Sequence, residues 1–261
     1  HGAATAFASR LARLGYNCVR LHSIDMPDTV PQVRNEGAAR GPAAGPFTHR
    51  PRGLIRDDLP DSQHFNPERL DRLDFWIADP KKNGIYVNSN LNAGRRSKPG
   101  DGVPDVDLLG PAKAFTYFGP ELIALQKDYA RKLLGHTNPY TGLRYADDPA
   151  VMTVEVVNEN SLLEFWMRNW LRGERVPGDE NAQLDMTPHY QKLLAGMFND
   201  WLGKHRSAAQ IASLRDMAGV AEGQPVPLMR RGDHPSAPRP RFGAVHEFIT
   251  QVEKSDPRHV V

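Results

Sequence analysis

The sequence of 261 residues lacks the features of several large protein classes. It contains one cysteine, which excludes an internal disulfide framework and a cysteine-rich zinc module. Its 33 Lys and Arg nearly balance its 31 Asp and Glu, so the net charge of +2 argues against a nucleic-acid partner bound through bulk charge. No segment approaches the roughly 18 consecutive apolar residues of a membrane span. We therefore expect neither nucleic acid nor membrane as a partner.

Several motifs of cofactor and metal chemistry are also missing. The ten histidines form no HExxH or HxH pattern, so no metal site is predicted. The nucleotide-binding loops GxGxxG and GxxxxGK[ST] are absent, and so is the GxSxG motif of serine hydrolases. We predict no cofactor.

Glycine and proline are abundant, with 22 residues of each. They concentrate in segments without periodicity, which predicts long irregular loops over 26–62, 93–119 and 219–241.

Between these loops, apolar residues recur with helical and then strand spacing, three times in succession. The first predicted helix is 3–14 and the third is 121–134. The second begins after Asn66, which caps it, and ends at Asn83-Gly84, although Pro80 could end it earlier. The predicted strands are 17–22, interpreted as a buried strand, then 85–87, and then 151–157, which is β-branched almost throughout and is also taken as buried. This alternation predicts an α/β fold with a parallel sheet. Four helices are expected downstream, within 161–171, 187–204, 208–217 and 242–252, and no strand between Leu171 and Val260.

Each predicted strand ends in polar residues, at the edge where α/β proteins place their chemistry. Asn158-Glu159 is the sharpest candidate, because partial desolvation at the mouth of a buried strand would suit Glu159 to be a general acid. The pair could equally belong to a helix-capping cluster in which Asn160 and Ser161 cap the next helix.

Arg20 and His22 end the first strand on one face. The arginine could orient a carboxylate and the histidine could bond a substrate hydroxyl, or Arg20 could be structural and pair with Asp25. The four tryptophans lie in helical segments and fit core positions; Trp166, near Glu159 in sequence, could instead stack on a sugar.

Four blocks, ASRLARLGYNCVRLHSID, LDRLDFWIADPKKNGIYVNSNLN, YARKLLGHTNPYTGLRYADDPAVMTVEVVNENSLL and GMFNDWLGKH, occur in an order and spacing that resemble cellulase-like enzymes of glycoside hydrolase family 5 and its neighbours. The resemblance covers roughly residues 1–205. It implies a TIM (β/α)8 barrel that hydrolyses a β-linked poly- or oligosaccharide with retention, and a secreted or periplasmic setting.

The resemblance also implies residue roles. Glu159 corresponds to the general acid/base, Asn158 to the residue that bonds the sugar 2-hydroxyl, and Arg20 to the arginine that supports the nucleophile. His22 lies where relatives carry two consecutive histidines, and Ser23 departs from that pattern. The predicted substrate-binding residues are His22, Asn88, Asn90 and Trp166.

A retaining glycosidase needs a second carboxylate about 5–5.5 Å from the first, and the family places it on the seventh barrel strand. The 102 residues after Glu159 contain no three further strands, so no nucleophile is assigned. We therefore expect residues 1–261 to be a single partial catalytic domain, holding barrel strands two to four and truncated at both ends.

Two alternatives stay open. The chain could be a non-catalytic carbohydrate-binding or scaffold protein on the same fold. It could also be another hydrolase that pairs Glu159 with Glu155 or Glu164; strand rise would put Glu155 some 13 Å from Glu159, too far for a dyad. The oligomeric state is not predicted.

Overall fold

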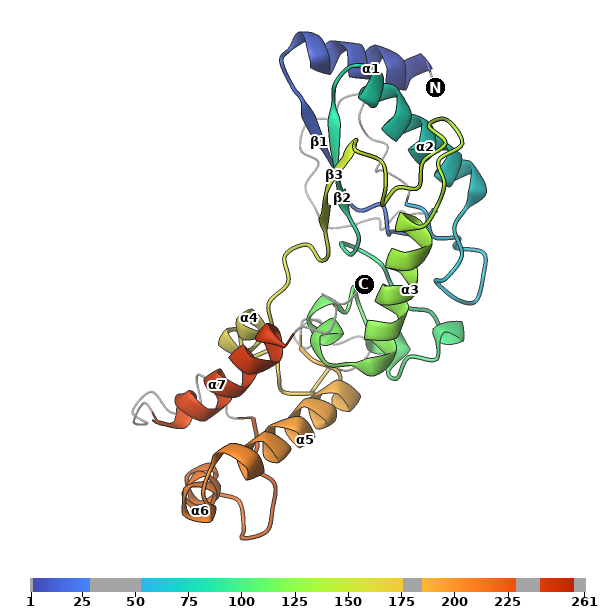
Figure 1. The fold of residues 1–261 in the computed structure, drawn as a ribbon. Helices are drawn as coiled ribbons and strands as arrows, with labels where there is room; N and C mark the ends of the chain where they lie inside the picture. The colour runs from blue at the N-terminus through green and yellow to red at the C-terminus, as the bar shows by residue number, and fades with distance from the viewer. Residues whose placement is uncertain (1, 29–52, 176–184, 229–239, 256–261) are drawn as a thin grey trace, which may run out of the picture. The chain divides into compact units, whose positions relative to one another are not determined.

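The computed structural model describes residues 2–28, 53–175, 185–228 and 240–255. The chain divides into two compact units: residues 1–101 with 125–159, and residues 102–124 with 160–260 (Figure 1). The first unit contains the sheet and the second is helical. The prediction of a single domain stays a prediction, because two compact units can belong to one catalytic domain.

The first unit is built on a parallel sheet of three strands in the order β1-β2-β3. The strands are β1 (Cys18–Leu21), β2 (Tyr86–Asn90) and β3 (Val151–Glu155). The register aligns Arg20 with Asn88, and Asn88 with Thr153. A shift between Val87 and Asn88 interrupts the β2–β3 ladder. The predicted α/β class and parallel sheet are confirmed; that the three strands are strands two to four of a partial TIM barrel stays a prediction.

Helices α1 (Gly2–Arg13), α2 (Pro67–Lys82) and α3 (Pro120–Leu134) alternate with the strands, as predicted. The side chain of Asn66 caps α2 by accepting from the backbone N–H groups of Glu68 and Arg69. Pro80 lies inside the last turns of α2 and does not end it. The apolar sides of α2 and α3 and one face of the sheet share one buried cluster, whose fully enclosed members include Ile77, Val87 and Leu133.

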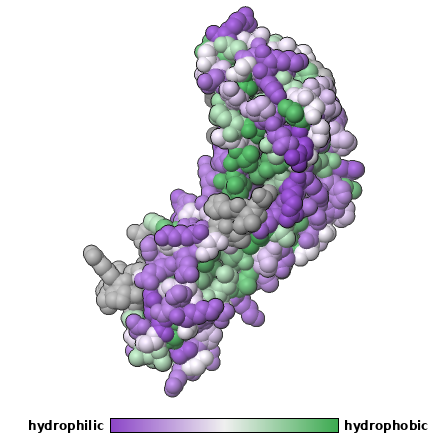
Figure 2. Space-filling model, in the orientation of Figure 1, coloured by the Kyte–Doolittle hydropathy of each residue, from purple (hydrophilic) through white to green (hydrophobic). Residues whose placement is uncertain are grey.

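Strand β3 is shorter and more exposed than the sequence predicted. It ends at Glu155 rather than at residue 157, and Met152 and Val154 are 53% and 37% exposed. The strand pairs with β2 on one side, and the described residues place no strand on its other side. Figure 2 shows apolar surface over this part of the unit. The β-branched composition correctly predicted a strand, but burial depends on neighbours that composition does not report.

The other edge of the sheet borders a groove of about 700 Å³ between α1, β1 and α2. Its walls are mostly apolar and aromatic, with Phe7 from α1, Leu21 from β1 and Trp76 from α2. The rings of Phe7 and Trp76 lie 5.9 Å apart. Arg20 and His22 also line this groove, so it adjoins the polar end of β1.

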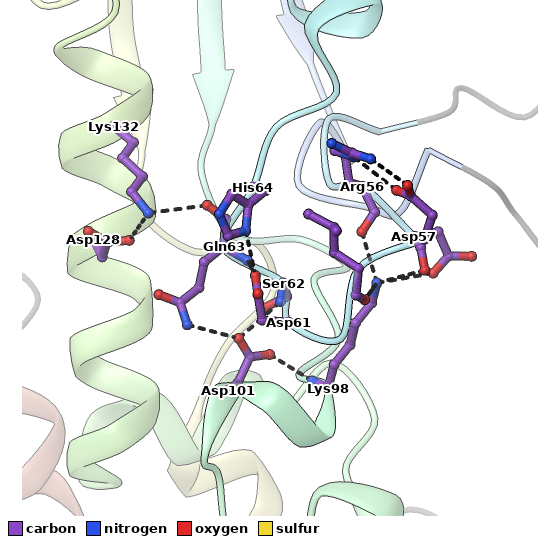
Figure 3. A network of polar contacts seen from close by, with 12 residues as sticks. Arg56, Asp57, Asp61, Ser62, Gln63, His64, Lys98, Asp101, Asp128 and Lys132 are labelled. Atoms are coloured by element: carbon purple, nitrogen blue, oxygen red, sulfur yellow. Dashed lines mark hydrogen bonds and ion pairs between the residues drawn. The ribbon is translucent and has the colours of Figure 1, made fainter.

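The described parts of the predicted loops 26–62 and 93–119 are tied together by a polar network (Figure 3). The Lys98 ammonium donates to the backbone oxygens of Arg56, Asp57 and Leu59 at 2.8–3.1 Å. The Asp101 carboxylate accepts from the N–H groups of Ser62 and Lys98. Lys132 of α3 donates to the backbone oxygen of Gln63. These bonds fix the loop after β2 against the segment that precedes α2.

The second unit consists of helices α4 (Leu162–Met167), α5 (Pro188–His205), α6 (Ala208–Ala218) and α7 (Pro240–Lys254), with 3₁₀ turns at Val106–Leu108 and Lys113–Tyr117. A second core forms where Phe198 and Trp201 of α5 meet Phe248 of α7, with ring centroids 5.3–6.3 Å apart. The four downstream helices are confirmed, and the described residues after Leu171 contain no strand. None of the described helices combines the length and apolar character required to cross a bilayer.

Candidate active site

The face of the sheet opposite the helices is polar. Paired residues of a parallel sheet point to the same face, so Arg20, Asn88 and Thr153 form one row across it. Asn90 and Glu155 form the next row toward the carboxyl ends of the strands. The sheet therefore gathers charged and amide side chains where parallel α/β proteins place their chemistry.

Arg20 and Glu155 form a two-pronged ion pair across this face. Nε of Arg20 donates to Oε2 of Glu155 at 2.8 Å, and Nη2 contacts Oε1 and Oε2 at 2.8 and 2.6 Å. Since β2 separates the two strands, the pair must pass over β2 between the rows of Asn88 and Asn90. The sequence suggested Asp25 as the partner of Arg20, and that prediction was wrong. The register of the strands, and not closeness along the chain, brings Glu155 to Arg20.

The same guanidinium orients Asn158. Nη2 of Arg20 donates to Oδ1 of Asn158 at 2.6 Å, and Asn158 is only 7% exposed. The backbone N–H of Asn158 donates to the backbone oxygen of Asn92 at 2.8 Å. Both the side chain and the backbone of Asn158 are therefore fixed relative to β1 and β2.

Glu159 follows Asn158 but lies outside the strand. Its side chain is exposed and its φ is +45°, a left-handed conformation that costs a residue with a Cβ roughly 1–2 kcal/mol. The expected desolvation at a buried strand mouth is therefore wrong. Because β3 ends at Glu155, the spacing extrapolated from strand rise between Glu155 and Glu159 does not apply either.

The two predicted asparagines of β2 face the same side of the sheet as Arg20. Asn90 is fully buried, and neither atom of its side-chain amide has a hydrogen-bond partner; Oδ1 of Asn88 also lacks one. Buried amides are normally bonded, so these atoms represent unused hydrogen-bonding capacity beneath the ion pair.

His22 lies just after β1 with an exposed side chain, at the rim of the apolar groove. Ser23, which departs from the family pattern, has φ +61°. The chain turns at this point, so the second position of the histidine pair falls in a bend and does not continue the strand.

Trp166 and Glu164 belong to the second unit. Trp166 is 6% exposed, with its ring 6.1 Å from that of His246. Glu164 pairs with Arg168 on the same helix, and Ser161 caps that helix, as the capping interpretation of this segment predicted. This packing matches a core tryptophan and a helix-stabilising glutamate; the sugar-stacking role and the Glu159–Glu164 dyad stay predictions.

Asp25, which the sequence suggested only as a partner of Arg20, is buried and holds the loop that follows β2. Its carboxylate accepts from the N–H groups of Ala93, Gly94 and Arg95 at 2.8–3.1 Å. Burial raises the pKa of Asp25 above its usual range, and these backbone bonds offset part of that effect. The carboxylate thus anchors the rim of the polar face instead of serving Arg20.

The described residues contain no group of three or more His, Cys, Asp or Glu side chains that could hold a metal ion. The strand side chains in the two rows on the sheet face are one guanidinium, two amides, one hydroxyl and one carboxylate.

Comparisons with known proteins give a limited set of similarities. No protein-family profile matches the chain, and no curated protein is similar to it. Among solved structures, the endo-1,4-β-mannanase of Rhizomucor miehei is similar at a TM-score of 0.41 and 20% identity, over 61% of this chain and 41% of the mannanase. A glycoside hydrolase family 5 mannosidase of the same organism is similar at 0.40 and 17%, over 62% of this chain and 40% of the mannosidase. The matched part of this chain thus covers about two fifths of the length of either enzyme.

Proposed function

We propose that the first unit forms the acid/base part of a retaining glycoside hydrolase site for a β-linked glycan. Glu159 is the general acid/base, Asn158 bonds a sugar hydroxyl, and polypeptide outside this sequence supplies the nucleophile. The observation that carries the proposal is the Arg20–Asn158 hydrogen bond. It fixes an amide directly before an exposed glutamate, at the carboxyl ends of parallel strands.

Protonation of a leaving oxygen requires a carboxyl group that solvent-borne substrate can reach. Glu159 meets this need because its side chain is exposed on a turn whose backbone is held by Asn92. Arg20 acts as a positioning residue in this proposal. Its guanidinium is already bonded to Glu155, so support of a nucleophile would have to come in addition to that pair.

The partial character of the domain is part of the proposal. Both outer strands carry features that a neighbouring strand would cover: exposed apolar side chains on β3, and the apolar groove beside β1. With the nucleophile absent, this chain should bind a β-glycan weakly without cleaving it.

The test is a titration of the 261-residue chain with cellohexaose, mannohexaose and xylohexaose, followed by NMR, with product analysis of the same samples. We expect millimolar binding of at least one hexaose, no cleavage, and at least a tenfold loss of affinity in Asn158→Ala. Thr153→Ala, also on the polar face but on exposed β3, is the matched control and should bind like wild type. Absence of binding to all three sugars contradicts the proposal.

A non-catalytic carbohydrate-binding protein is the second candidate. Glu155 is the carboxylate nearest to Glu159 along the chain, and it is paired with Arg20. This pairing favours the second candidate, because it occupies the carboxylate that would otherwise be closest to Glu159 for a catalytic pair. Binding that is unchanged in both Asn158→Ala and Glu159→Gln would support this candidate.

A further inference from the structure

Gln126 interrupts the apolar side of helix α3. With Tyr129, Ala130 and Leu133 it follows the i, i+3, i+4, i+7 spacing of one helix face, and all four side chains are buried. Gln126 is 6% exposed. A glutamine on such a face is costly unless both halves of its amide are bonded.

Both halves are bonded, to the ends of two different strands. Oε1 of Gln126 accepts from Nδ2 of Asn92 at 3.2 Å, just beyond β2. Nε2 donates to the backbone oxygen of Val156 at 3.1 Å, just beyond β3. One side chain therefore links the helix to the two segments that carry the polar face.

The location of these bonds coincides with the end of the β2–β3 ladder. The N–H of Leu91 still donates to the oxygen of Glu155 at 2.9 Å, and the next backbone bond joins Asn158 to Asn92 at 2.8 Å. Between them, the oxygen of Val156 is bonded by the side chain of Gln126. Gln126 thus satisfies a backbone group at the point where the chain leaves the strand and enters the turn.

We propose that Gln126 is a positioning residue for the turn that carries Asn158 and Glu159. The role as an acid/base turn rests on the proposed function; the positioning itself does not. An apolar side chain could fill the same space, but it would leave the oxygen of Val156 and the amide of Asn92 without these partners. The turn, including the left-handed Glu159, would then be held by fewer bonds.

Hydrogen exchange of the whole chain tests the positioning directly. Gln126→Met keeps the volume and removes both bonds. We expect the Asn158 amide to exchange about tenfold faster, equivalent to 1.4 kcal/mol, while the Val87 amide, bonded to Ala150 in the ladder, changes less than threefold. Tyr129→Phe is the matched control. It removes another buried oxygen, one without a hydrogen-bond partner, from the same helix face and should leave Asn158 exchange within threefold of wild type.

Equal acceleration at Asn158 and Val87 would mean that Gln126 only stabilises the unit, and unchanged exchange at Asn158 would mean that it does not hold the turn; either overturns the proposal. Gln126→Glu is the second variant: its ionised carboxylate keeps an acceptor for Asn92 and replaces the donor to Val156 with a second acceptor, which repels the Val156 oxygen. Its Asn158 amide should exchange at least threefold faster, and wild-type exchange would overturn the proposal. Hexaose titration of the same variants separates the two claims. Faster exchange at Asn158, together with a wild-type chain that binds no sugar, retains the positioning role and rejects the glycosidase function.

Discussion

The Arg20–Glu155 pair offers the clearest energetic prediction, because a double-mutant cycle isolates it. The variants are Arg20→Met, which keeps the aliphatic length, Glu155→Gln, and the double variant. The side chains are 42% and 30% exposed, so the usual worth of a surface pair, about 0.2–1 kcal/mol, sets the scale. Two-pronged geometry puts this pair at the upper end, and we expect a coupling of about 1 kcal/mol.

Arg20→Met should cost more than the pair alone. It also removes the bond to Oδ1 of Asn158, which adds about 1 kcal/mol. We therefore expect a total loss of about 2 kcal/mol in Arg20→Met and about 1 kcal/mol in Glu155→Gln. The assay is urea-dependent hydrogen exchange of the Val87 amide, which reports unfolding of the sheet unit separately from the helical one.

The exposed pair between Arg72 and Glu68 on α2 is the matched control, with side chains 56% and 67% exposed. As an i,i+4 helix pair it should show a coupling of about 0.3–0.5 kcal/mol. A coupling for Arg20–Glu155 no larger than this control would show that the pair is worth no more than an ordinary surface pair and would contradict the prediction. So would an Arg20→Met loss no greater than that of Glu155→Gln, because Arg20 would then not hold Asn158.

Three further predictions follow from individual residues. Asn90→Leu should raise the unfolding free energy by about 1 kcal/mol, because it removes a buried amide without partners, and should weaken hexaose binding; a loss of stability in urea titration would contradict the first part. Glu159→Gly should be more stable than Glu159→Ala by about 1 kcal/mol, because glycine accepts the φ of +45° without strain; equal urea midpoints would contradict this. Asp25 has a raised pKa in the folded state, so the folded protein holds that proton more tightly than the unfolded chain does. The unfolding free energy of wild type minus that of Asp25→Asn should therefore fall as the pH rises from about 4 through the folded-state pKa, and a rise over that window would contradict the assignment.

The secondary structure could be predicted from local patterns. The Asn66-Pro67 start of α2, the β-branched segment of β3 and the helical spacing of Leu194, Phe198 and Trp201 each determine an element through neighbours close in sequence. Contacts between elements could not be predicted in this way. Glu155 is the partner of Arg20 because a register shift at Val87/Asn88 sets how β3 lies against β2.

Some features of the candidate site could likewise be predicted from local sequence, and others could not. The adjacency of Asn158 and Glu159 follows from the sequence alone. The shared face of Asn88 and Asn90 follows from strand alternation only because β2 continues to Asn90, three residues beyond the predicted end at residue 87. The exposure of Glu159 could not be predicted from the sequence, because it depends on β3 ending at Glu155, four residues before Glu159. Gln126 carried a usable signal, a polar residue on the buried spacing of α3, but its two partners become visible only in three dimensions.

The proposed assignment of Glu159 as the acid/base is tested most directly by azide rescue in the full-length product of the gene that encodes this chain. In Glu159→Ala, hydrolysis of a 2,4-dinitrophenyl β-glycoside should stall at the glycosyl-enzyme, because no base activates water. Azide needs no such base. We predict that added azide accelerates turnover at least tenfold and yields the β-glycosyl azide, while natural glycan is cleaved at less than a hundredth of the wild-type rate. Wild-type activity of Glu159→Ala on natural glycan, or no response to azide, would contradict the account.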